Sequence, residues 1–223
     1  MNTRERIGRI VVGVIRQALT DAGVRGLVLL DDDSPEARLA GEWCREAAGA
    51  HFSWAQPGGS ASVEVELTTR GGGASHPVET PEAVQQAVDR WGASIQAAHT
   101  PGGALLVGAA NKTALLLSPA PPPEPLLPVG DLYATDLRAL TGGYSLPARV
   151  RALAELAGGV DALDAALRAH FDERRRLEEA LAPLPEEARE PLAQALSAAR
   201  FARRRVGLVP KLGARTLGAD LFA

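Results

Sequence analysis

The chain has 223 residues, a length that one α/β domain can fill. Its formal net charge of -3, from 24 basic and 27 acidic residues, lacks the basic excess that would favour nucleic acid or an anionic membrane as a partner. One cysteine, Cys44, excludes an internal disulfide, and no leader or long apolar span is seen. We therefore expect a single domain over 1–223, cytoplasmic, with no nucleic-acid or membrane partner.

The N-terminal part of the chain combines helix patterns with a short apolar run. Apolar residues recur at helical spacing over 4–22 and stop at Gly23, which predicts a helix with a glycine C-cap. Residues 26–30 are continuously apolar, as in a central parallel strand. A serine followed by a proline then begins a helix over 34–48, which ends at Gly49.

The same alternation continues toward the middle of the chain. Residues 63–67 alternate apolar and acidic side chains, which predicts a strand with one solvated face. A helix is expected from Thr80 to about Gly102, and residues 104–107 form the next buried strand. Alternation of this kind predicts an α/β fold, a parallel sheet flanked by helices on both faces.

The remainder of the chain is predicted to be helical. Residues 111–117 and 131–140 form helices on either side of a proline-rich loop at 119–125. A helical C-terminal subregion extends over roughly 147–205. Its breaks are expected at Gly158-Gly159, at 183–185 and at Pro191.

The loop 31–36 follows the first strand, at the sheet edge where parallel-sheet proteins bind ligands. A phosphate site there would need glycines that bring backbone N–H groups close to the anion. Asp31, Asp32 and Asp33 instead favour the following helix through its dipole and would repel a polyphosphate. We interpret the loop as a solvated acidic helix start. The alternative is a divalent-metal site made by Asp32, Asp33 and Glu36.

The histidines, the cysteine and the arginine runs are predicted to have structural or surface roles. The four histidines have no metal-ligand spacing and no nucleophile-plus-base pattern, so we expect surface or core positions for His51, His76, His99 and His170. Cys44 lies on an apolar helix face and is expected to be an inert buried thiol. The arginine runs 174–176 and 203–205 are expected to form solvated, ion-paired faces rather than a nucleic-acid patch.

Two segments on either side of the proline loop resemble a known family. They are G-A-A-N-K-T-A-L-L-L at 108–117 and P-V-G-D-L-Y-A-T-D-L-R-A-L at 128–140, and the basic, proline-containing segment 203–220 supports them. Taken in order, they resemble the ammonia-dependent NAD synthetases. In that family a strand leads into G-T-x-N-K-[ST]-E, and P-[IL]-G-D-L-Y-K-T-x-V-R opens the next helix. The resemblance implies an adenine-nucleotide α-hydrolase-like fold.

The resemblance also implies a chemistry and a site. The family activates deamido-NAD with ATP and magnesium, releases pyrophosphate and lets ammonia attack the adenylate. Homodimers are typical of it. The positions that match its nucleotide site are Asp32, Asp33, Ser34, Asn111, Lys112 and Asp131. We expect Gly130 and Asp131 to remain as a turn and helix cap, and Tyr133 as a packing residue.

The chain departs from the family pattern where phosphate and metal would bind. The phosphate loop S-G-G-x-D-S falls on 32–37, without its glycines and serines, and an A-R-x-R segment falls on 93–96, without its arginines. Ala109, Ala114 and Ala134 replace the family's threonine, metal-binding glutamate and lysine. One lost electrostatic donor costs on the order of 100- to 1000-fold in rate, and several are lost here.

These departures predict an NAD-synthetase-like protein that has lost amidation and acts as a structural or regulatory homologue. It would be a homodimer or the partner of an active relative, with no cofactor unless ATP and magnesium bind an altered site. One alternative is a divergent adenine-nucleotide-binding protein in which Asp32, Asp33 and Glu36 hold a metal and Lys112 contacts the ligand. The other is an active synthetase that converts deamido-NAD, ATP and ammonia to NAD.

Overall fold

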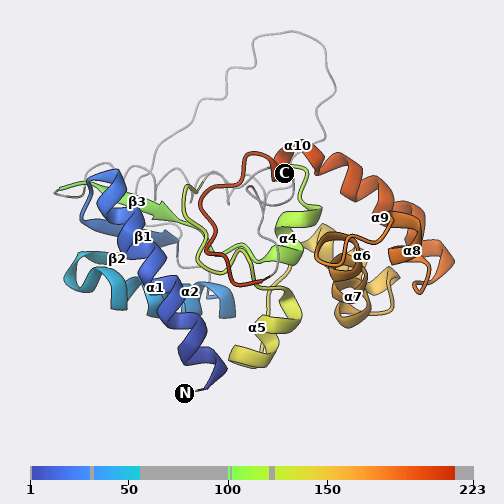
Figure 1. Cartoon of the computed structure of the whole chain (residues 1–223), viewed down its shortest axis with the longest axis horizontal. Helices are drawn as coiled ribbons and strands as arrows, with labels where there is room; N and C mark the ends of the chain where they lie inside the picture. Colours follow the sequence, from blue (N-terminus) through green and yellow to red (C-terminus); the bar gives the residue numbers. More distant parts are fainter. Residues whose placement is uncertain (1, 31–32, 56–99, 101, 121–123, 214–223) are drawn as a thin grey trace, which may run out of the picture.

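A computed structural model of the chain describes residues 2–30, 33–55, 100, 102–120 and 124–213 (Figure 1). The predicted strand over 63–67 and nearly all of the predicted helix over 80–102 lie outside the described residues. In chain order the elements are α1 (Thr3–Ala22), β1 (Gly26–Leu30), α2 (Pro35–Ala48), a 3-10 turn (Gly49–His51), β2 (Phe52–Ala55), β3 (Ala104–Val107), α4 (Lys112–Leu117), α5 (Ala134–Thr141), α6 (Ala148–Leu156), α7 (Val160–Phe171), α8 (Leu177–Leu181), α9 (Glu186–Ala198) and α10 (Arg200–Arg203).

The described strands form one parallel sheet in the order β2-β1-β3. Leu27 at the centre pairs with Phe52 of β2 and with Leu105 of β3. The α/β fold with parallel strands that the sequence predicts is confirmed. Strand β2 was not predicted, because F-S-W-A is too short to show a period and follows α2 after only a 3-10 turn.

Helices α1 and α2 pack together on the face of β1 that carries Leu27 and Leu29. Their contact is close, since a Cβ added at Gly8 of α1 would lie 2.8 Å from the Trp43 indole nitrogen of α2. Helix α1 ends as expected, with Gly23 in the left-handed region at φ 66°. This core therefore fixes the position of the loop that follows β1.

A second hydrophobic core lies away from the sheet, among the C-terminal helices (Figure 1). Helix α4 joins the two regions, because it follows β3 directly and its leucines pack with α6, α7 and α9. The core includes Leu116, Leu153, Leu163, Leu167, Leu192 and Leu196. Helix α4 is thus the element through which the sheet positions the helical subregion.

The segment after α10 returns to the sheet region (Figure 1). Leu208 forms a parallel bridge with Leu126, and Leu126 forms one with Val107 of β3. The Leu127 N–H donates to the Leu208 carbonyl and the Leu208 N–H to the Pro125 carbonyl, at 2.9 and 2.7 Å. The chain approaches so closely here that a Cβ on Gly207 would lie 2.5 Å from the Pro125 oxygen. Only glycine fits this crossing without displacement.

The predicted helix start and cap at Asp131 are wrong. Helix α5 begins at Ala134 with Tyr133 as its N-cap, and the Asp136 carboxylate accepts the Tyr133 N–H at 3.0 Å. Asp131 does not cap the helix because its carboxylate accepts two backbone N–H groups of the C-terminal segment instead, those of Leu212 and Gly213. The helix therefore starts one turn later than the sequence pattern indicates.

The predicted breaks at Gly158-Gly159 and at 183–185 are confirmed, but Pro191 lies inside α9. Pro191 lacks the N–H that would bond the Glu187 carbonyl, and Glu187 is an exposed residue in the first turn, where water can satisfy that group. An unpredicted break separates α7 from α8 at 172–176. No helix in the described part of the chain is long and apolar enough to cross a membrane.

Candidate functional site

The described part of the acidic loop acts as a helix start. Asp31 and Asp32 lie outside the described residues. Asp33 is exposed in the left-handed region at φ 58°, and its carbonyl accepts from the Arg38 guanidinium at 2.9 Å. The Ser34 hydroxyl accepts the Ala37 N–H at 3.0 Å and caps α2. The helix start that the sequence predicts at this position is confirmed.

Glu36 points into the protein and joins three segments. Its side chain is 2% exposed, and Oε1 accepts from the Asn111 amide at 2.9 Å and from the Ser145 N–H at 2.7 Å. Asn111 also caps α4, since its Oδ1 accepts the Ala114 N–H at 2.9 Å. Glu36 and Asn111, expected in separate metal and nucleotide roles, thus bond directly to each other. They hold α2, α4 and the segment before α6 together.

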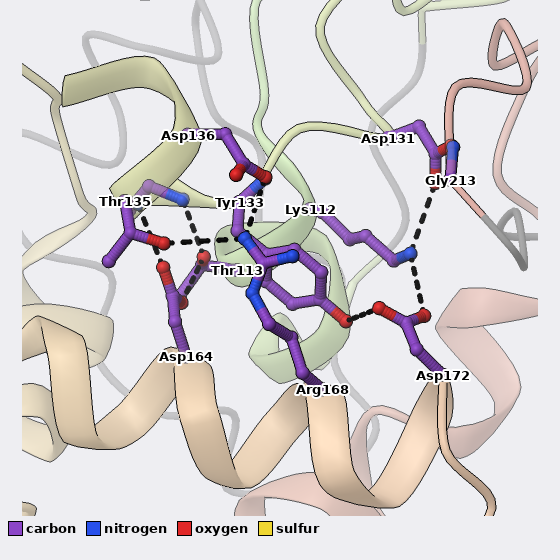
Figure 2. Close-up of polar contacts among 11 residues, drawn as sticks. Lys112, Thr113, Asp131, Tyr133, Thr135, Asp136, Asp164, Arg168, Asp172 and Gly213 are labelled. Carbon is purple, nitrogen blue, oxygen red and sulfur yellow. Dashed lines mark hydrogen bonds and ion pairs between the residues drawn. The ribbon is translucent and has the colours of Figure 1, made fainter. Parts of the chain in front are cut away.

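Lys112 lies between two carboxylates at the first residue of α4 (Figure 2). Its ammonium nitrogen is 3.1 Å from Asp131 Oδ1 and 3.0 Å from Asp172 Oδ1. The nitrogen also lies 4.8 Å from the centre of the Tyr133 ring, and only 1% of the residue is exposed. We call Lys112, Asp131, Tyr133 and Asp172 the lysine cluster. One buried cation therefore serves two anionic partners.

Tyr133 completes the lysine cluster as a neutral donor. Its hydroxyl donates to Asp172 Oδ2 at 3.0 Å (Figure 2). Burial first, and then the charge of Asp172, raise the pKa of the phenol far above its usual range. The Arg168 guanidinium lies 4.0 Å from the ring centre, on a helix that packs against α5. Tyr133 therefore does more than fill space, the only role that the sequence predicts for it.

A further buried carboxylate, that of Asp164 in α7, lies beside the lysine cluster (Figure 2). Its oxygens accept from the Thr113 hydroxyl at 2.6 Å and from the Thr135 N–H at 2.8 Å. The Thr113 oxygen in turn accepts the Ala134 N–H at 2.9 Å. Burial raises the pKa of Asp164, although these hydrogen bonds oppose the shift. The chain of bonds fixes the starts of α4 and α5 on α7.

The C-terminal segment closes over Asp131. Asp131 Oδ2 accepts the N–H groups of Leu212 and Gly213, both at 2.7 Å, while Oδ1 faces Lys112. Each polar side chain of the N-K-T segment therefore contacts a different part of the fold. Asn111 contacts Glu36 of α2, Lys112 contacts Asp131 and Asp172, and Thr113 contacts Asp164 of α7.

Asp164 and Asp172 were missed by the sequence analysis. A signal was present for Asp164, because it occupies the helical stripe that Val160, Leu163 and Leu167 define and so falls on the buried face of α7. An acidic residue on such a face requires a buried partner. Asp172 follows the last residue of α7 and carries no comparable signal.

The remaining candidates are placed largely as expected. Cys44 is fully buried, as expected, and burial raises the pKa of its thiol to about 12, which disfavours the reactive thiolate. His51 is exposed, and the His170 ring nitrogen Nδ1 is 3.0 Å from the Arg175 carbonyl. His76 and His99 lie outside the described residues. Within the described ranges no group of three His, Cys, Asp or Glu side chains is arranged to hold a metal.

The parallel sheet, with a capped helix directly after β3 and a C-terminal segment that returns to the sheet, defines an α/β protein of a recognisable architecture. Its fold is that of the NH3-dependent NAD synthetase from Campylobacter jejuni subsp. jejuni NCTC 11168, solved in complex with the nitrate ion. The TM-score is 0.58 at 15% identity, and the match covers 91% of this chain and 96% of that one. The fold that the family resemblance implies is confirmed.

A second solved structure is similar over part of its length. It is the glutamine-dependent NAD+ synthetase from Acinetobacter baumannii in complex with ADP, with a TM-score of 0.46 and 16% identity. The match covers 99% of this chain and 49% of that chain, so this chain spans about half of that protein. No family model and no curated protein matches the chain.

Proposed function

We propose that this NAD-synthetase-like protein has lost ATP-dependent amidation and serves as a structural or regulatory homologue. The observation that carries the proposal is the position of Lys112, the cation expected near the phosphates. Its ammonium group is buried and contacts Asp131 and Asp172 at 3.1 and 3.0 Å. A phosphate that approached this nitrogen would have to displace one carboxylate and would be repelled by the other.

The carboxylates near α2 support the same proposal. Magnesium needs carboxylate oxygens in an octahedral shell and keeps several waters. Glu36 Oε1 already accepts two N–H groups and is shut off from solvent, whereas Asp33 faces outward. The buried position of Glu36 and the outward direction of Asp33 thus argue against one magnesium ion shared by these two side chains.

The test is an amidation assay with a binding measurement beside it. The purified protein is incubated with deamido-NAD, ATP, magnesium and ammonia, with an active NH3-dependent NAD synthetase as the positive control, and NAD is followed by chromatography. Calorimetry then measures ATP and deamido-NAD binding with and without magnesium. We expect no NAD and no heat of binding that depends on magnesium.

Two other outcomes would redirect the proposal. ATP-dependent formation of NAD would show a true synthetase with an unusual site. Magnesium-dependent ATP binding without NAD would favour a divergent nucleotide-binding protein that uses Asp32, Asp33 and Glu36. In that case the double variant Asp32→Asn/Asp33→Asn should abolish the heat, and the exposed-site control Asp21→Asn/Glu46→Gln, matched in charge, should retain it.

The proposal extends to assembly, as a homodimer or as the partner of an active relative. This part rests on the family resemblance. Light scattering after size-exclusion chromatography would measure the mass of the protein alone and after mixing with an active NAD synthetase. A dimer, or a mixed complex, supports the proposal, and a monomer under both conditions contradicts it. The cytoplasmic location stays a prediction that fractionation of cells would test.

A further inference from the structure

A hollow of about 520 Å³ lies between the end of α7, the segment 172–176, α9 and α10. It lies beyond the C-terminal end of α4, whereas Lys112 is at the N-terminal end. Its basic lining residues are His170, Arg174, Arg175, Arg200, Arg203 and Arg204. No described acidic residue lines it. We call this hollow the arginine pocket.

Arg203 forms the buried part of the arginine pocket. It is 8% exposed, and its Nη1 donates to the carbonyls of Leu116 and Leu196, both at 2.9 Å. Its guanidinium also lies 5.2 Å from the centre of the Phe171 ring. Nε and Nη2 donate to no acceptor among the described residues. The expectation of a solvated, ion-paired face is therefore wrong for Arg203, because the fold buries it against carbonyls.

The charge of Arg203 is poorly compensated. Burial lowers its pKa to about 10, and the neighbouring charge of Arg200 acts in the same direction. At neutral pH the group stays protonated, so the pocket has a cation at its inner end, and no described carboxylate lines the pocket or pairs with that cation. A bound anion would offset both the burial of the Arg203 charge and its repulsion by Arg200.

The rim of the arginine pocket adds exposed positive charge. Arg175 pairs with Glu173 at 2.8 Å, but Arg174 and Arg200 have no carboxylate within ion-pair distance in the described part of the chain. Arg174 is also held in the left-handed region at φ 61°, a conformation that costs free energy for a residue with a side chain. The apolar residues Phe171, Leu177 and Leu196 line the rest of the hollow.

We propose that the arginine pocket binds a phosphorylated small molecule. Guanidinium groups present forked N–H donors that match phosphate oxygens, with Arg203 as the inner donor and Arg174 and Arg200 as donors at the rim. Phe171 and the leucines would contact the less polar part of the ligand. This site is separate from the lysine cluster and does not depend on the loss of amidation.

Calorimetry without magnesium, at constant ionic strength, tests the proposal with four probes: inorganic phosphate, pyrophosphate, AMP and adenosine. We expect the phosphate-bearing probes to bind and adenosine not to bind. Tighter binding of AMP than of pyrophosphate would identify a phosphate ester, and the reverse a free phosphate. Absence of binding by all three phosphate probes, or equal binding of adenosine and AMP, would overturn the proposal.

A pair of variants with the same change in charge assigns the binding to the pocket. Arg174→Gln/Arg200→Gln removes two rim cations and should weaken binding by at least about tenfold, since hydrogen bonds to charged groups are the stronger ones. Arg6→Gln/Arg149→Gln removes two exposed cations outside the pocket and should leave binding unchanged. Equal weakening of binding by both double variants would mean that general charge attraction holds the probe, and it would refute binding in the arginine pocket. Circular dichroism confirms that both variants fold.

Discussion

The lysine cluster and the arginine pocket lie at opposite ends of α4 and differ in how many carboxylates surround their cations. In the cluster one buried ammonium group contacts two carboxylates. The arginine pocket is lined by five arginines and by no acidic residue among those described, and Arg175 pairs with Glu173 beside it. A lysine of the family motif thus lies between two carboxylates, whereas an arginine run expected to form an ion-paired face lines a hollow. The partners that the fold brings to a cation decide its role.

The largest expected effect is that of Lys112→Met, which removes the cation from the lysine cluster. The buried carboxylate of Asp131 and the partly buried one of Asp172 would lose their partner, and the free energy of unfolding should fall by about 3–5 kcal/mol. Urea denaturation measures the loss, with Arg149→Met, a change at an exposed cation away from the cluster, as the control. Adding Asp172→Asn should recover part of the stability. A loss below about 1 kcal/mol would contradict a buried ionic cluster.

A smaller loss is expected from Gly207→Ala, which acts on the cluster through the C-terminal segment. The new Cβ would lie 2.5 Å from the Pro125 oxygen, so the segment must shift away from Pro125, at a cost of about 1–3 kcal/mol. Gly13→Ala is the matched control. Gly13 is exposed in the middle of α1 and no atom lies within 4 Å of its added Cβ, so this change should stabilise by about 0.5–1 kcal/mol. Hydrogen exchange at the Leu208 amide should speed up only in the first variant.

Asp164 tests whether hydrogen bonding or charge matters beside the cluster. Asp164→Ala leaves the Thr113 hydroxyl and the Thr135 N–H without their acceptor, and the cost should be about 1–3 kcal/mol. Asp164→Asn keeps an acceptor and should cost less. Because the fold raises the pKa of Asp164, its contribution to stability is greatest below the unfolded-state pKa of about 4 and is lost as pH rises through the folded-state pKa.

The wild-type protein should therefore gain stability relative to Asp164→Asn as the pH falls toward about 4. Urea denaturation of both proteins at pH 7 and pH 4 measures the difference. A difference that is constant with pH would mean that the fold does not perturb the ionisation of this carboxyl group.

The smallest expected effect is a gain in stability rather than a loss. Arg200→Gln removes a charge that repels Arg203, so the thermal midpoint should rise slightly, and the rise should vanish in 1 M salt, where charges are screened. Arg149→Gln, an exposed change outside the arginine pocket, should leave the midpoint unchanged. Destabilisation by Arg200→Gln would mean that the positive charge of Arg203 is already compensated.

Local patterns predicted much of the fold. The bounds of α1, β1, α2, β3 and α4 follow from apolar spacing together with caps such as Ser34, Asn111 and Gly23, which act within one turn of their own position. Prediction of α5 failed at its start because Asp131 contacts Leu212, far along the chain. Pro191 was misjudged because a proline in the second turn of a helix loses only one hydrogen bond.

Less of the candidate site was predictable. The sequence identified Glu36, Asn111, Lys112 and Asp131, but not that Glu36 bonds Asn111 or that Lys112 faces two carboxylates. Those contacts depend on how α2, α4 and α7 pack, which no local pattern encodes. The basic runs were visible as sequence, yet their gathering around one hollow required the break at 172–176 and the turn into α10.

The bonds between Asp131 and the C-terminal segment also have a consequence for the order of events in folding. The acceptor and its two donors are separated by 81 and 82 residues, so this carboxylate stays hydrated until nearly all of the described chain has been synthesised. Closing such a long loop is slow relative to forming helices. Docking of this segment should therefore be a late step in refolding, and Lys112 should become inaccessible to solvent only when that step is complete.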